Sequence, residues 1–314
     1  MNSPFQKKGL FFLNMTPQQK PNFIIIGAMK AATTSLYTYL KQHPDVFMTT
    51  IKEPMFFNNF QKNNNFKVHG KKTKKITTFE QYYPLFDAVK NEKAIGEASP
   101  AYISNEDCPS LIQQHFPDTK IIAVLRQPVS RAYSNFLHAR RADKEPIADF
   151  ETAFNKEEER KAENWSPLYH YKGKGYYAEQ LERYFTLFPK ENVKVLLFED
   201  LIKNPVETTQ EVFKFLNIDN SFIPNTSKKA NVSGTPKGLF GLFIMKLRYY
   251  NLIPNIQFSN YLPGFIIQFI FKAAYKKASP LAPELKKRLT HTFYKEDILK
   301  LEKLIGKNLQ HWLS

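Results

Sequence analysis

A lysine and a group of hydroxyl side chains stand close together near the N-terminus of the chain. They belong to one short segment, Lys30-Ala31-Ala32-Thr33-Thr34-Ser35. The segment follows residues 23–26, a β-branched apolar run that ends at Gly27 and is typical of a buried strand. Thr33 and Thr34 are suited to capping a helix, and the free amides of a helix start attract anions, as does a lysine. The spacing therefore predicts a phosphate or sulfate cradle between a strand and a helix that begins near residue 33 or 34.

A second strand and helix place an arginine in a similar position. Residues 120–125 form another buried apolar run, and Arg126 follows it directly. Pro128 is placed as at the first turn of a helix, which we expect to continue through Ser134 to about residue 141. In parallel sheets, ligands bind outside the carboxyl ends of the strands. Lys30 and Arg126 are therefore expected to face the same crevice.

A candidate base lies between these two units. Glu53 precedes Pro54, which favours an extended conformation at residue 53. The apolar residues Met55, Phe56 and Phe57 follow, so we expect the segment to turn inward and to carry Glu53 toward an apolar environment. A carboxylate in that position could accept a proton from a substrate.

Apolar runs alternate with helical patterns along most of the chain, which favours a parallel α/β sheet. The further strands are expected at residues 94–97 and 193–198, and residues 46–48 are a short apolar run. Helices are expected at residues 78–90, 109–116, 149–163, 176–188 and 205–216, and in the last segment, 293–312. The helix at 149–163 is rich in Glu and Lys, which indicates a solvated face. We predict a P-loop-like parallel sheet of about five strands flanked by helices. A single domain would cover residues 20–314, with a helical C-terminal part at 239–314 and a flexible segment at 1–19.

The net charge of +16 is the unusual feature of the composition. It favours polyanionic partners such as phosphorylated nucleotides, acidic sugars or anionic lipid. Nucleic-acid-binding motifs are absent, so no nucleic-acid partner is expected. The single cysteine, Cys108, allows no intrachain disulfide, in agreement with a reducing compartment. Neither a signal peptide nor a membrane span is evident. We therefore expect a cytoplasmic protein, with peripheral contact to the inner face of the membrane as an option.

These motifs, in this order, resemble the sulfotransferases that use 3'-phosphoadenosine 5'-phosphosulfate (PAPS). The chain looks closest to bacterial proteins similar to the heparan sulfate O- and N-sulfotransferases. The resemblance covers nearly the whole of residues 20–314 and rests on segments 25–35, 52–57, 96–102, 125–134, 175–178 and 294–312.

The resemblance implies a role for each candidate residue. Residues 30–35 would bind the 5'-phosphosulfate, Arg126 and Ser134 would bind the 3'-phosphate, and Glu53 would be the base. In the basic loop at 228–238, Lys237 and Gly238 would close over the donor. No metal is implied, and the acceptor would be a hydroxyl or amine of a carbohydrate or glycolipid.

Two departures from the family and two alternatives bear on this interpretation. Ala32 replaces a glycine of the first loop, and Ala98 replaces a lysine that contacts acidic polysaccharide in some relatives. One alternative is a small-molecule kinase that uses ATP and Mg²⁺, with Glu97 or the pair Glu199 and Asp200 as metal ligands. The other is a basic membrane-surface protein without catalysis, built around residues 239–275, although packing of that segment on the core is favoured.

Overall fold

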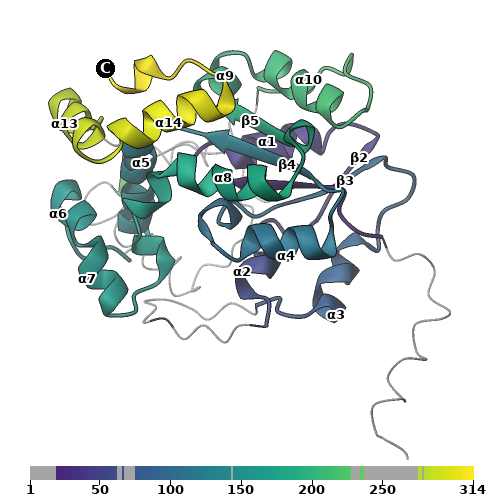
Figure 1. The fold of residues 1–314 in the computed structure, drawn as a ribbon, viewed down its shortest axis with the longest axis horizontal. Coiled ribbons are helices and arrows are strands. Elements are labelled where there is room, and N and C mark those ends of the chain that lie inside the picture. The colour runs from purple at the N-terminus through teal and green to yellow at the C-terminus, as the bar shows by residue number, and fades with distance from the viewer. Residues whose placement is uncertain are drawn as a thin grey trace, which may run out of the picture.

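Five parallel strands form the centre of the molecule (Figure 1). A computed structural model describes residues 19–61, 66, 75–142, 144–227, 234–236, 275–277 and 279–314. The strand order is β2-β3-β1-β4-β5, and every neighbouring pair is parallel. The strands are β1 Phe23–Gly27, β2 Val46–Met48, β3 Ala94–Ala98, β4 Lys120–Leu125 and β5 Val193–Leu197. The predicted sheet is therefore confirmed.

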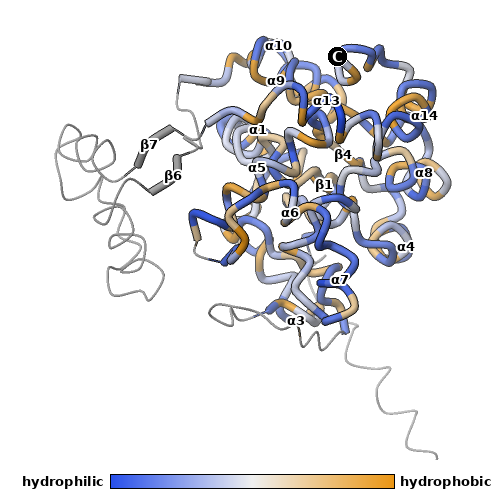
Figure 2. The backbone as a smooth tube through the Cα atoms, turned by 90° about the vertical axis from the view of Figure 1, so that its left-hand side faces the viewer, coloured by the Kyte–Doolittle hydropathy of each residue, from blue (hydrophilic) through white to orange (hydrophobic). Residues whose placement is uncertain are grey.

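The strands are largely apolar because helices cover both faces of the sheet, and their charged residues are Glu97, Lys120 and Lys194. All residues of β1 and β3 are buried, and so are five of the six residues of β4. Figure 2 shows the hydrophobic segments gathered around β1 and β4, with hydrophilic segments on the outside. This burial explains why unbroken apolar runs, rather than alternating patterns, predicted the strands.

The helices agree with the predicted segments in most places. The prediction of one helix at 78–90 is wrong, because α3 ends at Tyr82 and the chain continues as a 3₁₀ turn to Phe86. The helices are α1 Thr33–Leu40, α2 Phe56–Asn59, α3 Phe79–Tyr82, α4 Cys108–His115, α5 Pro128–Arg141, α6 Phe150–Asn155, α7 Glu157–Ala162, α8 Tyr177–Leu187, α9 Phe198–Lys203, α10 Pro205–Phe215, α13 Pro283–Phe293 and α14 Lys295–Ile305. Short 3₁₀ turns lie at Tyr83–Phe86, Tyr102–Ser104, Pro167–Tyr169, Gly173–Gly175, Lys190–Asn192 and Gln310–Trp312.

The helices form layers on the two faces of the sheet. Helix α8 packs against α4 and α14, and these helices lie on the near face of the sheet in Figure 1. Helix α1 packs against α10, and α1 lies behind the sheet in the same view. The C-terminal helices α13 and α14 pack on α5 and α8, so the end of the chain covers the helix that follows Arg126.

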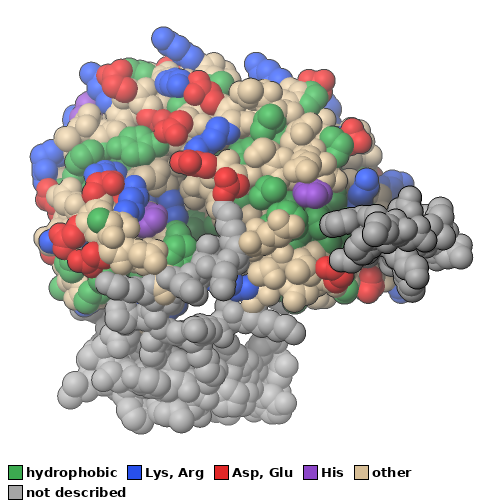
Figure 3. Space-filling view, turned by 60° about the horizontal axis from the view of Figure 1, so that its bottom comes forward, with side chains coloured by type: hydrophobic (Ala, Val, Ile, Leu, Met, Phe, Trp, Pro, Cys, Tyr) green, Lys and Arg blue, Asp and Glu red, His purple; other side chains and the backbone are tan. Residues whose placement is uncertain are grey.

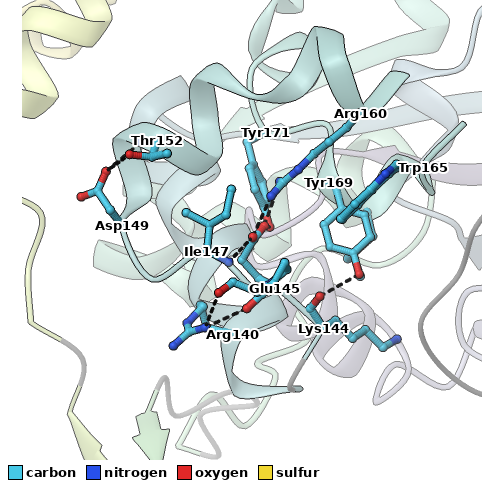
Figure 4. Close-up of polar contacts among 12 residues, drawn as sticks. Arg140, Lys144, Glu145, Ile147, Asp149, Thr152, Arg160, Trp165, Tyr169 and Tyr171 are labelled. Atoms are coloured by element: carbon cyan, nitrogen blue, oxygen red, sulfur yellow. Dashed lines mark hydrogen bonds and ion pairs between the residues drawn. The ribbon is translucent and has the colours of Figure 1, made fainter. Parts of the chain in front are cut away.

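The prediction of a solvated helix at 149–163 is wrong in two respects. The segment forms two helices, α6 and α7, and the side chains of Glu157 and Arg160 are buried. Arg160 makes a two-pronged ion pair with the buried Glu145, with bonds of 2.8 and 2.7 Å (Figure 4). The Tyr171 hydroxyl donates to the same carboxylate at 2.6 Å. These partners are distant in sequence, so charge content alone could not predict the burial.

Several predicted segments lie outside the described residues. They include residues 1–18, residues 239–274, and the basic loop at 228–238 apart from β6 Gly234–Pro236. Strand β6 pairs in antiparallel fashion with β7 Tyr275–Lys277. Within the described part of the chain, no helix is long and apolar enough to cross a membrane.

Candidate active site

The topology brings four loops to one edge of the sheet. Strand β1 lies between β3 and β4, so the loops that follow these three strands are neighbours. The loop after β2 joins them, since the Glu53 amide donates to the Ala98 carbonyl at the end of β3, at 3.1 Å. The carboxyl edge of a parallel sheet, where the strand order reverses, is the usual place for a ligand.

The first loop, between β1 and α1, has an unusual backbone. Lys30 and Ala32 have φ angles of 69° and 64°, in the left-handed region that favours glycine. Helix α1 begins at Thr33 as predicted, but the expected hydroxyl cap is absent: Ala32 is the N-cap residue, and no side chain caps the helix. Thr33 is buried, whereas Thr34 and Ser35 are partly exposed. The uncapped amides of α1 therefore remain suited to an anion.

Lys30 lies in a crowded basic environment. Burial, together with the positive charges of Arg141, Arg126 and Lys52, lowers the pKa of Lys30 to about 8, and the carboxylate of Glu53 opposes the shift. These interactions place the Lys30 ammonium within electrostatic reach of both Arg126 and Glu53. A cation destabilised by burial and by other cations is stabilised when an anion binds.

Arg126 directly contacts the first loop. Its Nη1 donates to the main-chain oxygen of Lys30 at 3.1 Å, and its guanidinium lies over the ring of Phe198 at 4.4 Å from the centroid. The Tyr177 hydroxyl donates to the Arg126 carbonyl at 2.9 Å. Burial lowers the pKa of Arg126 from its ordinary value. The structure thus brings Lys30 and Arg126 together, as the sequence predicted.

Ser134 lies on α5, the helix that follows Arg126, and it is partly exposed. Its hydroxyl has no hydrogen-bond partner among the residues that the structure describes. Gln127 fixes the start of this helix, because its side chain accepts a hydrogen bond from the Ser130 amide at 2.7 Å. The same side chain donates to Thr290 on α13 at 2.7 Å. The C-terminal helices therefore hold the loop that carries Arg126.

The predicted environment of Glu53 is wrong. Its side chain is 41% exposed and forms an ion pair with Lys52, with Nζ and Oε1 2.5 Å apart. The chain turns inward only after this residue: Pro54, Phe56 and Phe57 are buried. The Glu53 side chain is therefore open to solvent.

Sequence reasoning missed a group of cations at the end of α5. The pKa of His138 is lowered to about 4, first by burial and then by the charges of Lys30, Arg141 and Lys144. Arg141 contacts the His138 ring, with Nη2 3.1 Å from Nδ1. The position of Pro128 predicted this helix, but only the folded chain shows that its C-terminal end lies near Lys30.

The remaining candidates divide into two groups. Lys237 and Gly238 lie outside the described residues. Glu97, Glu199 and Asp200 were considered as ligands for a metal. Glu97 is buried and accepts hydrogen bonds from three hydroxyls, whereas Glu199 and Asp200 lie in the first turn of α9. Within the described part of the chain, His, Cys, Asp and Glu form no group of three that could hold a metal ion.

Comparison with known protein families matches residues 21–222 to the sulfotransferase family, well over half of the 314 residues. The chain belongs to this family. Its structure is similar to that of a sulfotransferase from Alicyclobacillus acidocaldarius, with a TM-score of 0.73 and 31% identity, over 94% of this chain and 100% of that one. That likeness confirms the sulfotransferase fold and favours sulfuryl transfer over the kinase alternative.

Two animal proteins show which relatives this sulfotransferase resembles in sequence. Mouse heparan sulfate glucosamine 3-O-sulfotransferase 3B1 is 28% identical over 241 residues, which cover 72% of this chain and 56% of the relative. Mouse bifunctional heparan sulfate N-deacetylase/N-sulfotransferase 4 is 28% identical over 217 residues, covering 67% of this chain and 24% of the relative. This sulfotransferase thus spans about half of the first relative and about a quarter of the second.

Proposed function

We propose that this sulfotransferase transfers the sulfuryl group of PAPS to a hydroxyl or amine of a carbohydrate or glycolipid acceptor. The observation that carries the proposal is the hydrogen bond from Arg126 to the Lys30 carbonyl, because it joins two cationic loops at one edge of the sheet. A nucleotide with phosphates on its 3' and 5' positions needs cations at both ends. The carbohydrate acceptor is proposed from the named substrates of the animal relatives.

The first loop fits the 5' end of such a donor. It offers the uncapped start of α1, the Lys30 ammonium and the partly exposed Thr34 and Ser35. The donor supplies a sulfuryl group on a phosphate leaving group, which can be displaced in line by an acceptor oxygen or nitrogen. Lys30 would stabilise the charge that grows on the leaving phosphate, and one such electrostatic contact is typically worth about 10²–10³ in rate.

The second loop fits the 3' end. Arg126 has one nitrogen on the Lys30 carbonyl, and its fork has further N–H donors for a phosphate. Ser134 offers a hydroxyl on the same structural unit. The charge balance also fits: the basic groups that act on Lys30 outnumber the single nearby carboxylate, Glu53. An anionic donor would compensate this excess.

Glu53 would accept the proton of the acceptor. Its exposure at the mouth of the site lets an acceptor approach from solvent, and its ion pair with Lys52 gives the carboxylate a fixed neighbour. We expect Lys52 to release Glu53, or to shift with it, when an acceptor binds.

The proposal is tested by incubating the full chain with PAPS labelled in its sulfuryl group and a panel of saccharide and glycolipid acceptors. We expect labelled product with the parent and none with Glu53→Gln, while Glu53→Gln binds adenosine 3',5'-bisphosphate as the parent does. Glu53→Asp should retain part of the turnover, since it keeps a carboxylate on a shorter side chain. Undiminished transfer by Glu53→Gln would exclude Glu53 as the base, and absence of transfer to every acceptor would count against a carbohydrate substrate.

A further inference from the structure

Glu97 is a carboxylate in the core of the protein, on the strand next to β1. Its side chain is fully buried, and it pairs in register with Ile24. No Lys or Arg within the described part of the chain forms an ion pair with it. A buried carboxylate needs hydrogen bonds in place of water. Three hydroxyls supply them: Ser99 at 2.7 Å, Tyr102 at 2.8 Å and Tyr82 at 3.2 Å.

Two of these hydroxyls also accept hydrogen bonds from backbone amides. The Met55 amide donates to Ser99 Oγ at 2.9 Å, and the Phe57 amide donates to the Tyr102 hydroxyl oxygen at 3.3 Å. An amide can only donate, and each hydroxyl has a single hydrogen, which is given to Glu97. The two chains of hydrogen bonds form a relay, and each chain runs in one direction, from the backbone amide to the hydroxyl to the Glu97 carboxylate.

Both amides belong to the Glu53 loop, residues 53–57, whose last two residues begin helix α2. In this loop Glu53 and Met55 have φ angles of 60° and 52°, a conformation that residues other than glycine rarely adopt. Such a backbone persists only when the surrounding contacts determine it. Here the amides of residues 53, 55 and 57 are all bound by the segment 98–102, the first by a carbonyl and the others by the two hydroxyls.

We propose that Glu97 is a positioning residue for sulfuryl transfer, which acts through Ser99 and Tyr102 to hold the loop that presents Glu53. The inference rests on the proposed role of Glu53 as the base. This role explains how Glu53 can have a defined position although its side chain faces solvent, because the hydrogen bonds that hold its loop are buried.

The relay requires an acceptor at both carboxylate oxygens. A glutamine at this position would donate from its NH₂ group on one side, so the hydroxyl on that side would lose the acceptor of its hydrogen. Burial raises the pKa of Glu97 to about 7, and the hydrogen bonds from the three hydroxyls oppose that rise. The hydrogen-bond pattern is thus the one that favours the ionised side chain.

Tyr82 supplies a matched control, because it donates to the same oxygen as Tyr102 but accepts no hydrogen bond from the Glu53 loop. Replacement of either tyrosine by phenylalanine removes one donor from Glu97 and keeps a ring in the core. Only Tyr102→Phe also removes the acceptor of the Phe57 amide. Ser99→Ala likewise removes the acceptor of the Met55 amide.

The experiment measures kcat, binding of adenosine 3',5'-bisphosphate and amide hydrogen exchange in the full chain. We expect Tyr102→Phe, Ser99→Ala and Glu97→Gln to lower kcat by about tenfold to 10²-fold, as misplacement of a catalytic group does. Nucleotide binding should stay at the parent's level. Exchange at Phe57 should accelerate in Tyr102→Phe and exchange at Met55 in Ser99→Ala. Tyr82→Phe removes a donor to Glu97 but no acceptor of these amides, so both exchange rates should stay at the parent's level and kcat should fall far less than in Tyr102→Phe.

The possible outcomes separate this inference from the proposed function. If Glu53→Gln abolishes turnover while Tyr102→Phe and Tyr82→Phe have equal kcat and equal exchange, the positioning role is overturned and the base remains. If Glu53→Gln retains turnover, Glu53 is excluded as the base. The relay then has no catalytic purpose, whatever the hydrogen-exchange rates of Met55 and Phe57 are. A loss of nucleotide binding in Tyr102→Phe equal to its loss of kcat would also overturn positioning, since the damage would then be general.

Discussion

Arg126 donates a hydrogen bond from Nη1 to the main-chain oxygen of Lys30, at 3.1 Å, across 96 positions of sequence. The bond links the loop after β1 to the loop after β4, two neighbouring strands of the sheet. It means that the Arg126 side chain, proposed to bind one end of the donor, also supports the backbone of Lys30, proposed to bind the other end. Loss of Arg126 should therefore remove a phosphate ligand at the 3' end and, to a much smaller extent, loosen the loop at the 5' end.

Arg126 should distinguish nucleotides by their 3'-phosphate. We expect Arg126→Ala to weaken binding of adenosine 3',5'-bisphosphate by about tenfold to 100-fold, the usual worth of a hydrogen bond to a charged group. Binding of adenosine 5'-monophosphate, which has no 3'-phosphate, should change much less. Ser134→Ala should reduce the same preference to a smaller extent, as a neutral hydroxyl contributes less. An unchanged ratio of the two affinities in Arg126→Ala would remove this residue from the 3' end.

The affinity for anionic nucleotides should depend on the protonation of Lys30. Its pKa is lowered to about 8, so the ammonium loses its proton as the pH rises through that value. For a site that needs the charged form, binding of adenosine 3',5'-bisphosphate should weaken about tenfold between pH 7 and pH 9. Calorimetric titration over this range measures the effect. Lys30→Arg keeps its positive charge at pH 9, so its affinity for the bisphosphate should not change with pH. If its affinity fell as steeply as the parent's, the pH dependence would belong to another group.

The buried pair of Glu145 and Arg160 should dominate the stability of the segment after α5. Glu145→Gln leaves a buried guanidinium without its counter-charge, which typically costs about 3–5 kcal/mol of unfolding free energy. The exposed pair of Glu151 and Arg288 is a control, since Glu151→Gln should cost at most about 1 kcal/mol. Urea unfolding compares the two variants. Equal losses would show that burial of the pair has no special weight.

Ala32 should tolerate replacement by glycine. Its φ of 64° is strained for alanine and relaxed for glycine. We expect Ala32→Gly to raise the unfolding free energy by about 0.5–1 kcal/mol, the balance of relieved strain and lost chain entropy. Ala32→Val, with a branched side chain, should lower it. A lower melting temperature for Ala32→Gly than for the parent would contradict this account of the loop.

The sequence was sufficient for the features that depend on local pattern. Apolar runs predicted β1, β4 and β5 because these strands are almost wholly buried, with a lysine only at Lys120 and Lys194. The two strand-loop-helix units placed Lys30 and Arg126 at the same edge. The alternation of Glu and Lys at 149–163 did not predict burial of Glu157 and Arg160. Arg160 pairs with Glu145, 15 positions away, and Glu157 accepts hydrogen bonds from the amides of Lys172 and Gly173 besides its ion pair with Lys161. The space-filling view in Figure 3 shows acidic and basic side chains interspersed over one face of the molecule. On that face the net charge of +16 does not produce a patch of one sign.

Other features depend on backbone geometry that composition does not encode. Lys30 and Met55 are left-handed without being glycines, so nothing in the sequence marked them. The extended conformation predicted for Glu53 is wrong, since its φ angle is 60°. Ala32 was marked only by the glycine that the resemblance implies at its position. Glu53 was expected to be buried because apolar residues follow it, but the chain turns inward one position later, at Pro54. The relay through Glu97 was missed because its hydroxyls come from the residue after β3, the 3₁₀ turn at Tyr102–Ser104 and helix α3, which the folded chain brings together.

The central claim is that one nucleotide with phosphates at both ends binds across the loops of Lys30 and Arg126. Calorimetric titration of the full chain tests it directly, with adenosine 3',5'-bisphosphate in the absence of added metal and with ATP and Mg²⁺ in parallel. The account predicts one-to-one binding of the bisphosphate by the parent, far weaker binding of ATP, and loss of bisphosphate binding in Lys30→Ala/Arg126→Ala. Equal affinity of the parent and the double variant, or tighter binding of ATP than of the bisphosphate, would contradict it.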